Sequence, residues 1–165
     1  MKIGVLALQG AFIEHQKSLE TVGAQTKQVR TPADLDGLDG LVIPGGESTT
    51  IGKLATAYGL IDPLRDFAQT KPTWGTCAGL IFLAKDIGID SQPILGLMDI
   101  SVNRNAFGRQ IDSFEVDLPI KGLGEDPFHA VFIRAPSVTE VRGDVEVLSR
   151  LPDETIVAVQ DGHLL

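Results

Sequence analysis

Apolar residues in the first half of the chain form runs of strand length that alternate with segments of helical pattern. Continuous apolar runs are typical of strands covered on both faces of a parallel sheet. They lie at 3–8 and 40–46, with a weaker strand at 25–30 and a further one at 72–77. The intervening segments with helical spacing or helix caps are 11–23, 50–59, 63–69 and 78–87. This alternation predicts a doubly wound α/β domain with a mainly parallel sheet.

Residues that favour caps indicate where these helices begin and end. Ser48 or Thr49 can cap the helix at 50–59. Asp62 followed by Pro63 predicts an N-cap and a first helical position. Gly23 suits a C-terminal cap for the first helix, one face of which consists of Phe12, Gln16, Leu19 and Val22.

The pattern changes after residue 95. Apolar residues alternate with polar ones at 98–102 and 114–120, which predicts half-buried, antiparallel strands. The run at 130–136 is apolar enough to predict burial, and 155–165 predicts a hairpin with a type I′ turn at Asp161 and Gly162. We therefore expect an α/β fold with a mainly parallel sheet and antiparallel strands in the C-terminal half, as a single domain over 1–165.

Composition and charge exclude several classes of function. A chain of 165 residues has room for one domain. Its net charge of −8, with scattered lysines and arginines, argues against a nucleic-acid partner. No apolar run approaches the roughly 20 residues that span a membrane, so we expect a soluble protein. The single cysteine allows neither an internal disulfide nor a multi-thiolate metal site, which fits a reducing cytoplasm. We expect no metal and no cofactor.

That cysteine, Cys77, stands between Gly75 and Gly79 where a predicted strand gives way to a helix. Gly-x-Cys-x-Gly is the thiol form of the nucleophile elbow, a sharp turn in which glycines two residues on either side avoid steric clashes. A helix N-terminus also favours the thiolate. The alternative is that Cys77 is a small buried apolar residue, as most lone cysteines are.

A second motif, "PGGEST" at 44–49, also ends a predicted strand. Its paired glycines let backbone N–H groups turn toward a ligand, as an acyl-transfer site requires for its oxyanion. The alternative is a tight loop that only needs positive φ.

These motifs resemble the triad-type (class I) glutamine amidotransferases, and within them the glutaminase subunits of pyridoxal 5′-phosphate synthase. The similar segments follow in order over nearly the whole chain: "GVLALQGAFIEH", "PGGEST", "GTCAGLIFLAK", "NRNAFGRQIDSFE" and "VFIRAP". The resemblance implies a flavodoxin-like three-layer fold, L-glutamine as the substrate, and ammonia passed to a synthase subunit for vitamin B6 synthesis.

The resemblance also implies roles for individual residues. Cys77 would attack the side-chain amide of glutamine, and the backbone N–H groups of Gly46 and Ala78 would hold the oxyanion. An arginine suits the substrate carboxylate, although Arg104 also fits a solvated surface residue. The implied substrate-binding positions are Gly46, Glu47, Ser48, Arg104, Ile133 and Arg134.

The family completes its triad with a His-x-Glu pair that this sequence does not contain. None of His15, His129 and His163 is followed by x-Glu. We therefore expect that the segment with the triad histidine and glutamate is missing from this chain. Three hypotheses stay open: a glutaminase subunit, a non-catalytic binding or regulatory module of the same fold, and a different cysteine hydrolase of similar architecture.

Overall fold

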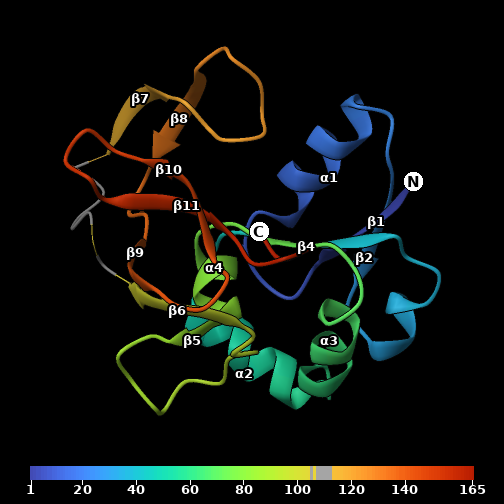
Figure 1. The fold of residues 1–165 in the computed structure, drawn as a ribbon. Helices are drawn as coiled ribbons and strands as arrows, with labels where there is room; N and C mark the ends of the chain where they lie inside the picture. The colour runs from blue at the N-terminus through green and yellow to red at the C-terminus, as the bar shows by residue number, and fades with distance from the viewer. Residues whose placement is uncertain (105, 107–112) are drawn as a thin grey trace.

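A parallel sheet forms the N-terminal half of the molecule. The computed structural model describes residues 1–104, 106 and 113–165. The sheet has the strand order β2-β1-β3-β4, and all of its pairs are parallel (Figure 1). Leu164 bridges Thr73 in parallel, which adds a short fifth segment beside β4. This is the 2-1-3-4-5 order of flavodoxin-like folds. The strands are β1 (Lys2–Leu6), β2 (Gln25–Val29), β3 (Gly40–Ile43) and β4 (Thr73–Gly75).

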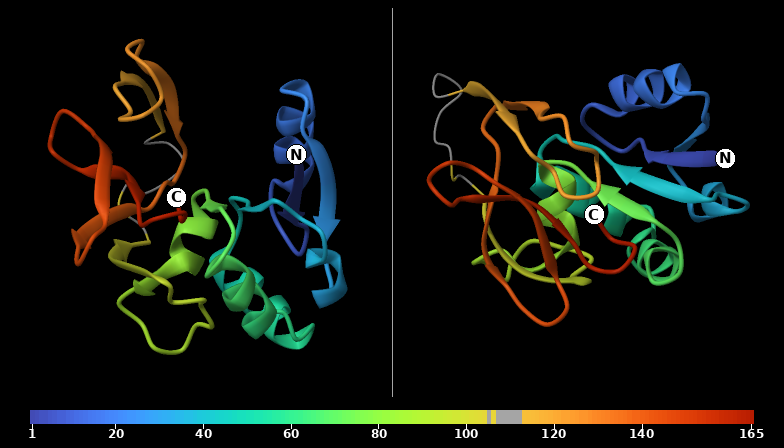
Figure 2. Two further views of the ribbon diagram at one scale, coloured as in Figure 1. Left: turned by 45° about the vertical axis from the view of Figure 1, so that its right-hand side comes forward. Right: turned by 45° about the horizontal axis from the view of Figure 1, so that its top comes forward.

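Helices cover both faces of this sheet and make three layers. On one face, α1 (Phe12–Thr21) packs Phe12 and Leu19 against buried residues of β1 and β3. The other face is covered by α2 (Ser48–Ala57), α3 (Ile61–Ala68) and α4 (Ala78–Leu83), which share the main hydrophobic core. Figures 1 and 2 show α1 on the opposite side of the sheet from α2 and α3. A 3₁₀ helix (Pro32–Leu35) follows β2.

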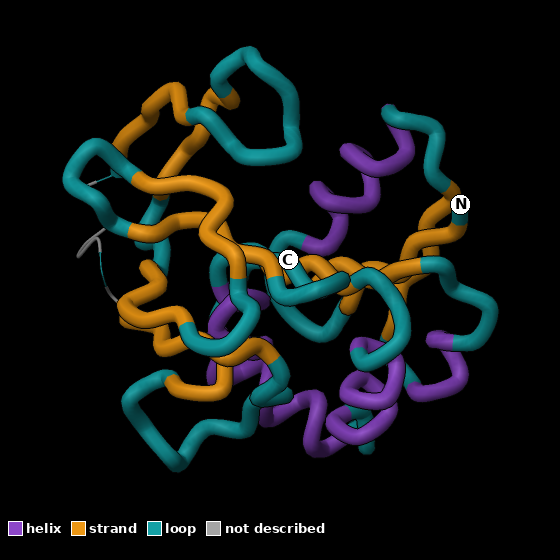
Figure 3. The backbone as a smooth tube through the Cα atoms, viewed as in Figure 1, coloured by secondary structure: helices purple, strands orange, loops and turns teal. Residues whose placement is uncertain are grey.

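The C-terminal half contains a five-stranded sheet and a two-stranded sheet (Figure 3). The larger sheet has the order β10-β11-β9-β6-β5, in which only the β5–β6 pair is parallel. The smaller is the antiparallel pair of β7 (Phe114–Leu118) and β8 (Phe128–Phe132). The strands of the larger sheet are β5 (Ala84–Asp86), β6 (Met98–Asn103), β9 (Ser137–Val141), β10 (Glu146–Arg150) and β11 (Ile156–Gln160). The predicted parallel and antiparallel halves are confirmed.

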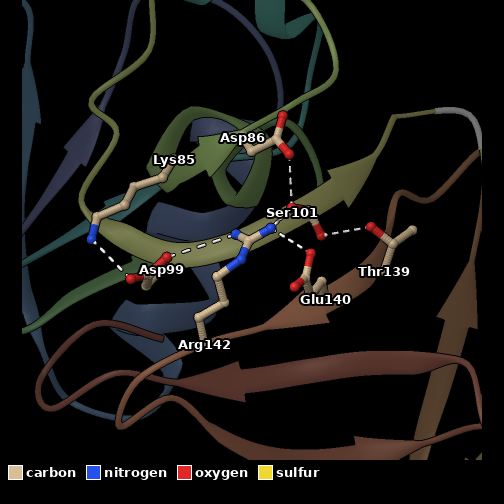
Figure 4. A network of polar contacts seen from close by, with 7 residues as sticks. All are labelled: Lys85, Asp86, Asp99, Ser101, Thr139, Glu140 and Arg142. Carbon is tan, nitrogen blue, oxygen red and sulfur yellow. Dashed lines mark hydrogen bonds and ion pairs between the residues drawn. The ribbon is translucent and has the colours of Figure 1, made fainter.

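A polar network ties β5, β6 and β9 together (Figure 4). Ser101 on β6 lies at its centre, because its hydroxyl donates to Asp86 at 2.8 Å and accepts from Arg142 at 2.8 Å. Arg142 also contacts Glu140 and Asp99. Hydrogen bonds to the backbone N–H of Gly88 and then to Ser101 hold the pKa of Asp86 below its usual value. The network keeps the parallel β5–β6 pair joined to the antiparallel part of the sheet.

The structure corrects three helix boundaries. Glu47, not Ser48 or Thr49, is the N-cap of α2. Helix α3 begins at Ile61, so Asp62 and Pro63 lie in its first turn instead of starting it. Helix α4 ends at Leu83, because the chain turns there into β5 and pairs with β6.

Two apolar segments differ from what their patterns indicate. Val22 was expected on one face of the first helix with Phe12 and Leu19, but it lies at the C-terminal cap of α1 and is 80% exposed. In the run 130–136, Val131 is 55% and Ile133 is 53% exposed. This run was expected to be buried, but it enters the two-stranded sheet of β7 and β8, and every residue of β8 is exposed or half-buried.

The predicted turn near the end of the chain is shifted by one residue. Asp161 and Leu164 pair through two backbone hydrogen bonds of 2.9 Å, so Gly162 and His163 are the central residues. Only Gly162 of these two has positive φ, at 58°. That is the pattern of a type II′ turn rather than type I′. The strand that pairs with β11 as its hairpin partner is β10, not 163–165.

Candidate active site

Cys77 lies at the carboxyl end of β4 in a strained backbone conformation. It is the N-cap of α4, with φ of 52° and ψ of −105°. Residues other than glycine rarely adopt positive φ, and such strain persists only where the surroundings hold it in place. The side chain is half-buried. A parallel α/β sheet binds its ligands at this edge, so the geometry fits a functional position.

The glycines around Cys77 are required by close backbone packing. A Cβ atom on Gly75 would lie 2.5 Å from the carbonyl carbon of Gly79, and one on Gly79 would lie 2.1 Å from the carbonyl oxygen of Ile43. No side chain fits at either position. The predicted reason for the Gly-x-Cys-x-Gly frame is thereby confirmed, while the role of Cys77 as a nucleophile stays a prediction.

The loop after β3 lies directly beside Cys77. A Cβ atom on Gly45 would be 3.3 Å from Cys77 Cβ and 4.0 Å from Sγ. Two groups from the turn after β1 hold this loop: Ala11 N–H donates to the Gly45 carbonyl at 2.9 Å, and Glu47 N–H donates to Gln9 Oε1 at 2.7 Å. Sequence reasoning missed Gln9, although the similar segment "GVLALQGAFIEH" contains it.

Two backbone N–H groups beside the thiol have no hydrogen-bond acceptor within the described residues. The Gly45–Gly46 peptide is trans, so its carbonyl and its N–H point in opposite directions. The Gly45 carbonyl faces Ala11, from which it accepts a hydrogen bond, and the Gly46 N–H therefore points away from Ala11. The Ala78 N–H is the first of α4, where helical partners are lacking. Neither group donates to an acceptor in 1–104, 106 or 113–165. Unpaired N–H groups are what an oxyanion site needs.

The side chain of Glu47 caps the start of α2, and the side chain of Ser48 is buried. Glu47 accepts hydrogen bonds from the N–H groups of Thr49 and Thr50 and from the Thr50 hydroxyl. The Thr50 hydroxyl is the main reason that the pKa of Glu47 lies below its usual value, against an opposing effect of burial. Ser48 is 4% exposed. With these side chains engaged in the fold, the backbone is the part of both residues that can face a substrate.

Arg104 is joined to the same helix start by a short polar relay. Its Nη2 donates to Thr49 Oγ1 at 3.2 Å, and the Thr49 hydroxyl donates to Gln92 Oε1 at 3.1 Å. Gln92 is 5% exposed. Arg104 Nε and Gln92 Nε2 are buried and lack partners among the described residues. This placement disfavours a solvated surface arginine. Nothing in the sequence pattern pointed to Gln92.

The other predicted binding residues lie after β8. Ile133 is 53% exposed, and Arg134 is also exposed and has positive φ, at 48°. In the described part of the chain, no hydrogen bond or ion pair joins Arg134 to the surroundings of Cys77. The structure thus brings Cys77, the Gly45–Gly46 loop and the start of α2 together, and its contacts do not extend this group to Ile133 and Arg134.

Each of the three histidines bonds groups other than the Cys77 thiol within the described residues. His15 bonds Ala11 and Thr76, His129 bonds Asp117 and Glu115, and His163 bonds the Ala68 carbonyl. Within the described residues, no group of three or more histidine, cysteine or acidic side chains is placed to hold a metal ion. No helix in this part of the chain is long and apolar enough to cross a membrane.

Comparisons with known proteins agree with this geometry. Residues 5–165 match the SNO glutamine amidotransferase family. A pyridoxal 5′-phosphate synthase subunit PdxT from Herpetosiphon aurantiacus is 56% identical over 169 residues, which span 100% of this chain and 89% of that protein. The subunit of the same name from Pelotomaculum thermopropionicum is 59% identical over 161 residues, or 97% of this chain and 82% of that protein.

Solved structures give the same result. A structure described as a crystal structure of glutamine amidotransferase superposes with a TM-score of 0.92 at 50% identity, covering 98% of this chain and 86% of the other. PurLQS from Thermotoga maritima shares the fold alone, with a TM-score of 0.66 at 17% identity. From the family match over nearly its whole length and from these identities, the chain belongs to the SNO glutamine amidotransferase family.

Proposed function

We propose that this protein is the glutaminase subunit of a pyridoxal 5′-phosphate synthase. It would hydrolyse L-glutamine to glutamate and ammonia, and the ammonia would pass to a synthase subunit for vitamin B6 synthesis. The observation that carries the proposal is the strained Cys77 backbone beside the Gly45–Gly46 loop, with the Gly46 and Ala78 N–H groups lacking an acceptor among the described residues. The names of the relatives support the pathway. The single cysteine supports a place in the reducing cytoplasm.

The chemistry follows from this arrangement. The Cys77 thiolate attacks the side-chain amide carbon of glutamine, and the amide oxygen becomes an oxyanion held by the N–H groups of Gly46 and Ala78. The carbon–nitrogen bond then breaks, the nitrogen takes up a proton and leaves as ammonia, and a γ-glutamyl thioester remains. Water attacks the thioester, which gives glutamate and returns the thiol. The net reaction is glutamine plus water to glutamate plus ammonia.

Substrate recognition would use groups on three sides of the thiol. The backbone of Gly46, Glu47 and Ser48 forms one side, and the Arg104 guanidinium is oriented from α2 through Thr49. Ile133 and Arg134 would close the pocket from the segment after β8. The positive φ of Arg134 supports this role, because strained residues cluster at functional sites.

Alkylation of Cys77 tests the function directly. A chloroketone analogue of glutamine should modify the full-length gene product at Cys77 alone, and excess glutamine should protect the thiol. Cys77→Ala should abolish ammonia release, whereas Cys77→Ser should lower it by several orders of magnitude. Full glutaminase activity in Cys77→Ala would overturn the assignment. Glutamine binding without turnover in the unmodified protein would instead favour a non-catalytic module, and peptide hydrolysis a different cysteine hydrolase.

The partner is tested by ammonia release with and without the synthase subunit, at equal subunit concentration and saturating glutamine. We expect weak activity from the isolated protein and stimulation by the synthase. Gly46→Ala should damage the stimulated rate, because its Cβ would lie 2.4 Å from Gln9 Oε1 and 2.9 Å from Gly10 Cα and would displace the loop. Equal rates with and without the synthase would contradict the coupling but leave the role of Cys77 intact.

A further inference from the structure

Among the interactions of the described residues, His15 is the histidine whose hydrogen bonds reach the segment that carries Cys77. Its Nδ1 lies 2.8 Å from the Ala11 carbonyl oxygen, and its Nε2 lies 3.1 Å from Thr76 Oγ1. A carbonyl oxygen can only accept, so Nδ1 carries a hydrogen, and Nε2 of the neutral ring accepts from the Thr76 hydroxyl. The ring is half-buried and makes an edge contact with Trp74, with centroids 6.1 Å apart.

Each of the two residues that His15 binds is joined to a different one of the two proposed oxyanion donors. Ala11 N–H holds the Gly45 carbonyl at 2.9 Å, which sets the direction of the Gly46 N–H. Thr76 precedes Cys77, and its own N–H donates to the Ile43 carbonyl at 3.0 Å. The position of Thr76 therefore fixes the positions of Cys77 and of the Ala78 N–H, which follow it directly in the chain. We call the two hydrogen bonds of His15, to Ala11 and to Thr76, the His15 bridge.

We infer that His15 is a positioning residue that holds the two oxyanion donors in register with each other. This inference rests on the proposed function. One donor, Gly46, is supplied by the loop after β3, and the other, Ala78, by the start of α4. The His15 bridge links these elements through α1, over a separation of 61 residues between His15 and Thr76. The strained backbone of Cys77 needs such outside support, because its conformation is unfavourable on its own.

The expected effect of breaking the bridge falls on the transition state. Oxyanion donors stabilise the tetrahedral intermediate more than the bound substrate, so misplacing them lowers kcat with little change in KM. Removing an oxyanion donor outright costs about 100-fold to 1,000-fold in kcat, and a donor that is only displaced should cost less, about tenfold. A residue that only stabilised the fold would not separate kcat from KM in this way.

The test uses the full-length gene product saturated with its synthase, with kcat and KM for glutamine as readouts. His15→Ala and Thr76→Val should each lower kcat about tenfold and change KM less than about twofold. The double variant should be no worse than either single variant, because both break one linked unit. His15→Gln should recover most of the kcat, since its amide oxygen can accept from Thr76. Lys17→Ala, an exposed change on the same helix, is the matched control.

The possible results distinguish a failure of the His15 bridge from a failure of the proposed glutaminase function. A wild-type protein that turns over glutamine, together with a His15→Ala variant of unchanged kcat, overturns the His15 bridge alone. Additive losses in the double variant, or a His15→Gln variant as impaired as His15→Ala, also overturn it. A wild-type protein without glutaminase activity overturns the proposed function and this inference together. If His15→Ala does not fold, Thr76→Val compared with Thr76→Ser decides the same question.

Discussion

Hydrogen bonds to threonine side chains fix the orientation of charged groups at the start of α2. At the first turn of α2, Thr50 holds the Glu47 carboxylate, and Thr49 joins Arg104 to Gln92. The loop that carries Gln92 is itself packed closely, because a Cβ on Gly52 would lie 2.3 Å from the Pro93 carbonyl oxygen. Thr49 therefore accepts from Arg104 at a position that α2 and this loop define together.

Removing the Thr49 hydroxyl should weaken glutamine binding. In Thr49→Val, Arg104 loses the acceptor that orients its guanidinium, and a group that binds the substrate carboxylate acts on ground and transition states about equally. We expect KM for glutamine to rise about two- to tenfold, the value of one hydrogen bond, with kcat nearly unchanged. Steady-state kinetics with the synthase present measure this. Thr56→Val, at the other end of α2, is the control, and an equal rise there would contradict the role of Thr49.

At the scale of elements, sequence patterns predicted those helices, strands and turns whose structure depends on interactions between residues close together in the chain. The four parallel strands and the turn at Cys77 were predictable, because glycines and apolar runs mark them in the sequence. The end of α4 was not, since its apolar and helix-favouring residues continue past Leu83 while Lys85 pairs with Asp99 on β6. The exposure of Val131 was missed for a similar reason, because an apolar run does not show how many layers cover it.

The β7–β8 pair contains a charge cluster that should respond to pH. His129 on β8 lies 2.8 Å from Asp117 and 3.1 Å from Glu115 on β7, and these side chains, Asp117 first, raise the pKa of His129 above its ordinary value of 6.5. A raised folded-state pKa means that the histidine stabilises the folded state fully below pH 6.5. This contribution is lost as the pH rises through the raised pKa.

Nuclear magnetic resonance titration of the His129 ring tests this cluster. Asp117→Asn should lower the pKa of His129 more than Glu115→Gln does, because the hydrogen bond to Asp117 is the larger cause of the shift. Asp126→Asn, in the connection between β7 and β8, should leave the His129 pKa in place. A wild-type pKa at or below 6.5, or equal effects of all three variants, would contradict the predicted pairing.

At the scale of the whole molecule, the site is assembled from contacts that lie far apart in the sequence. Gln9, His15 and Thr76 come from three segments, and only the fold brings their side chains to the same edge of the sheet. Sequence patterns report on neighbours along the chain, so Cys77 and the Gly45–Gly46 loop could be predicted and the His15 bridge could not. The same applies to the segment 163–165, which was predicted to pair with β11 and instead lies beside β4.

That segment ties the C-terminal half of the molecule to the strand that leads to Cys77. Backbone bonds join Thr73 to His163 and Leu165, and Gly75 N–H donates to the Leu165 carbonyl at 2.8 Å. The Leu164 side chain is 7% exposed and belongs to the main core, whereas Leu165 is 37% exposed. Both leucines therefore belong to the segment that pairs with β4, but only the Leu164 side chain is buried in the core.

Alanine substitutions at these two leucines should separate core packing from backbone pairing. Leu164→Ala leaves a cavity where the two halves meet, and buried leucine truncations cost about 2–5 kcal/mol in the free energy of unfolding. Leu165→Ala removes an exposed side chain and should cost at most about 0.5 kcal/mol. Urea unfolding followed by circular dichroism measures both. If the two variants lose equal stability, the backbone pairing and not the Leu164 side chain joins the halves, since both variants keep the hydrogen bonds to Thr73 and Gly75.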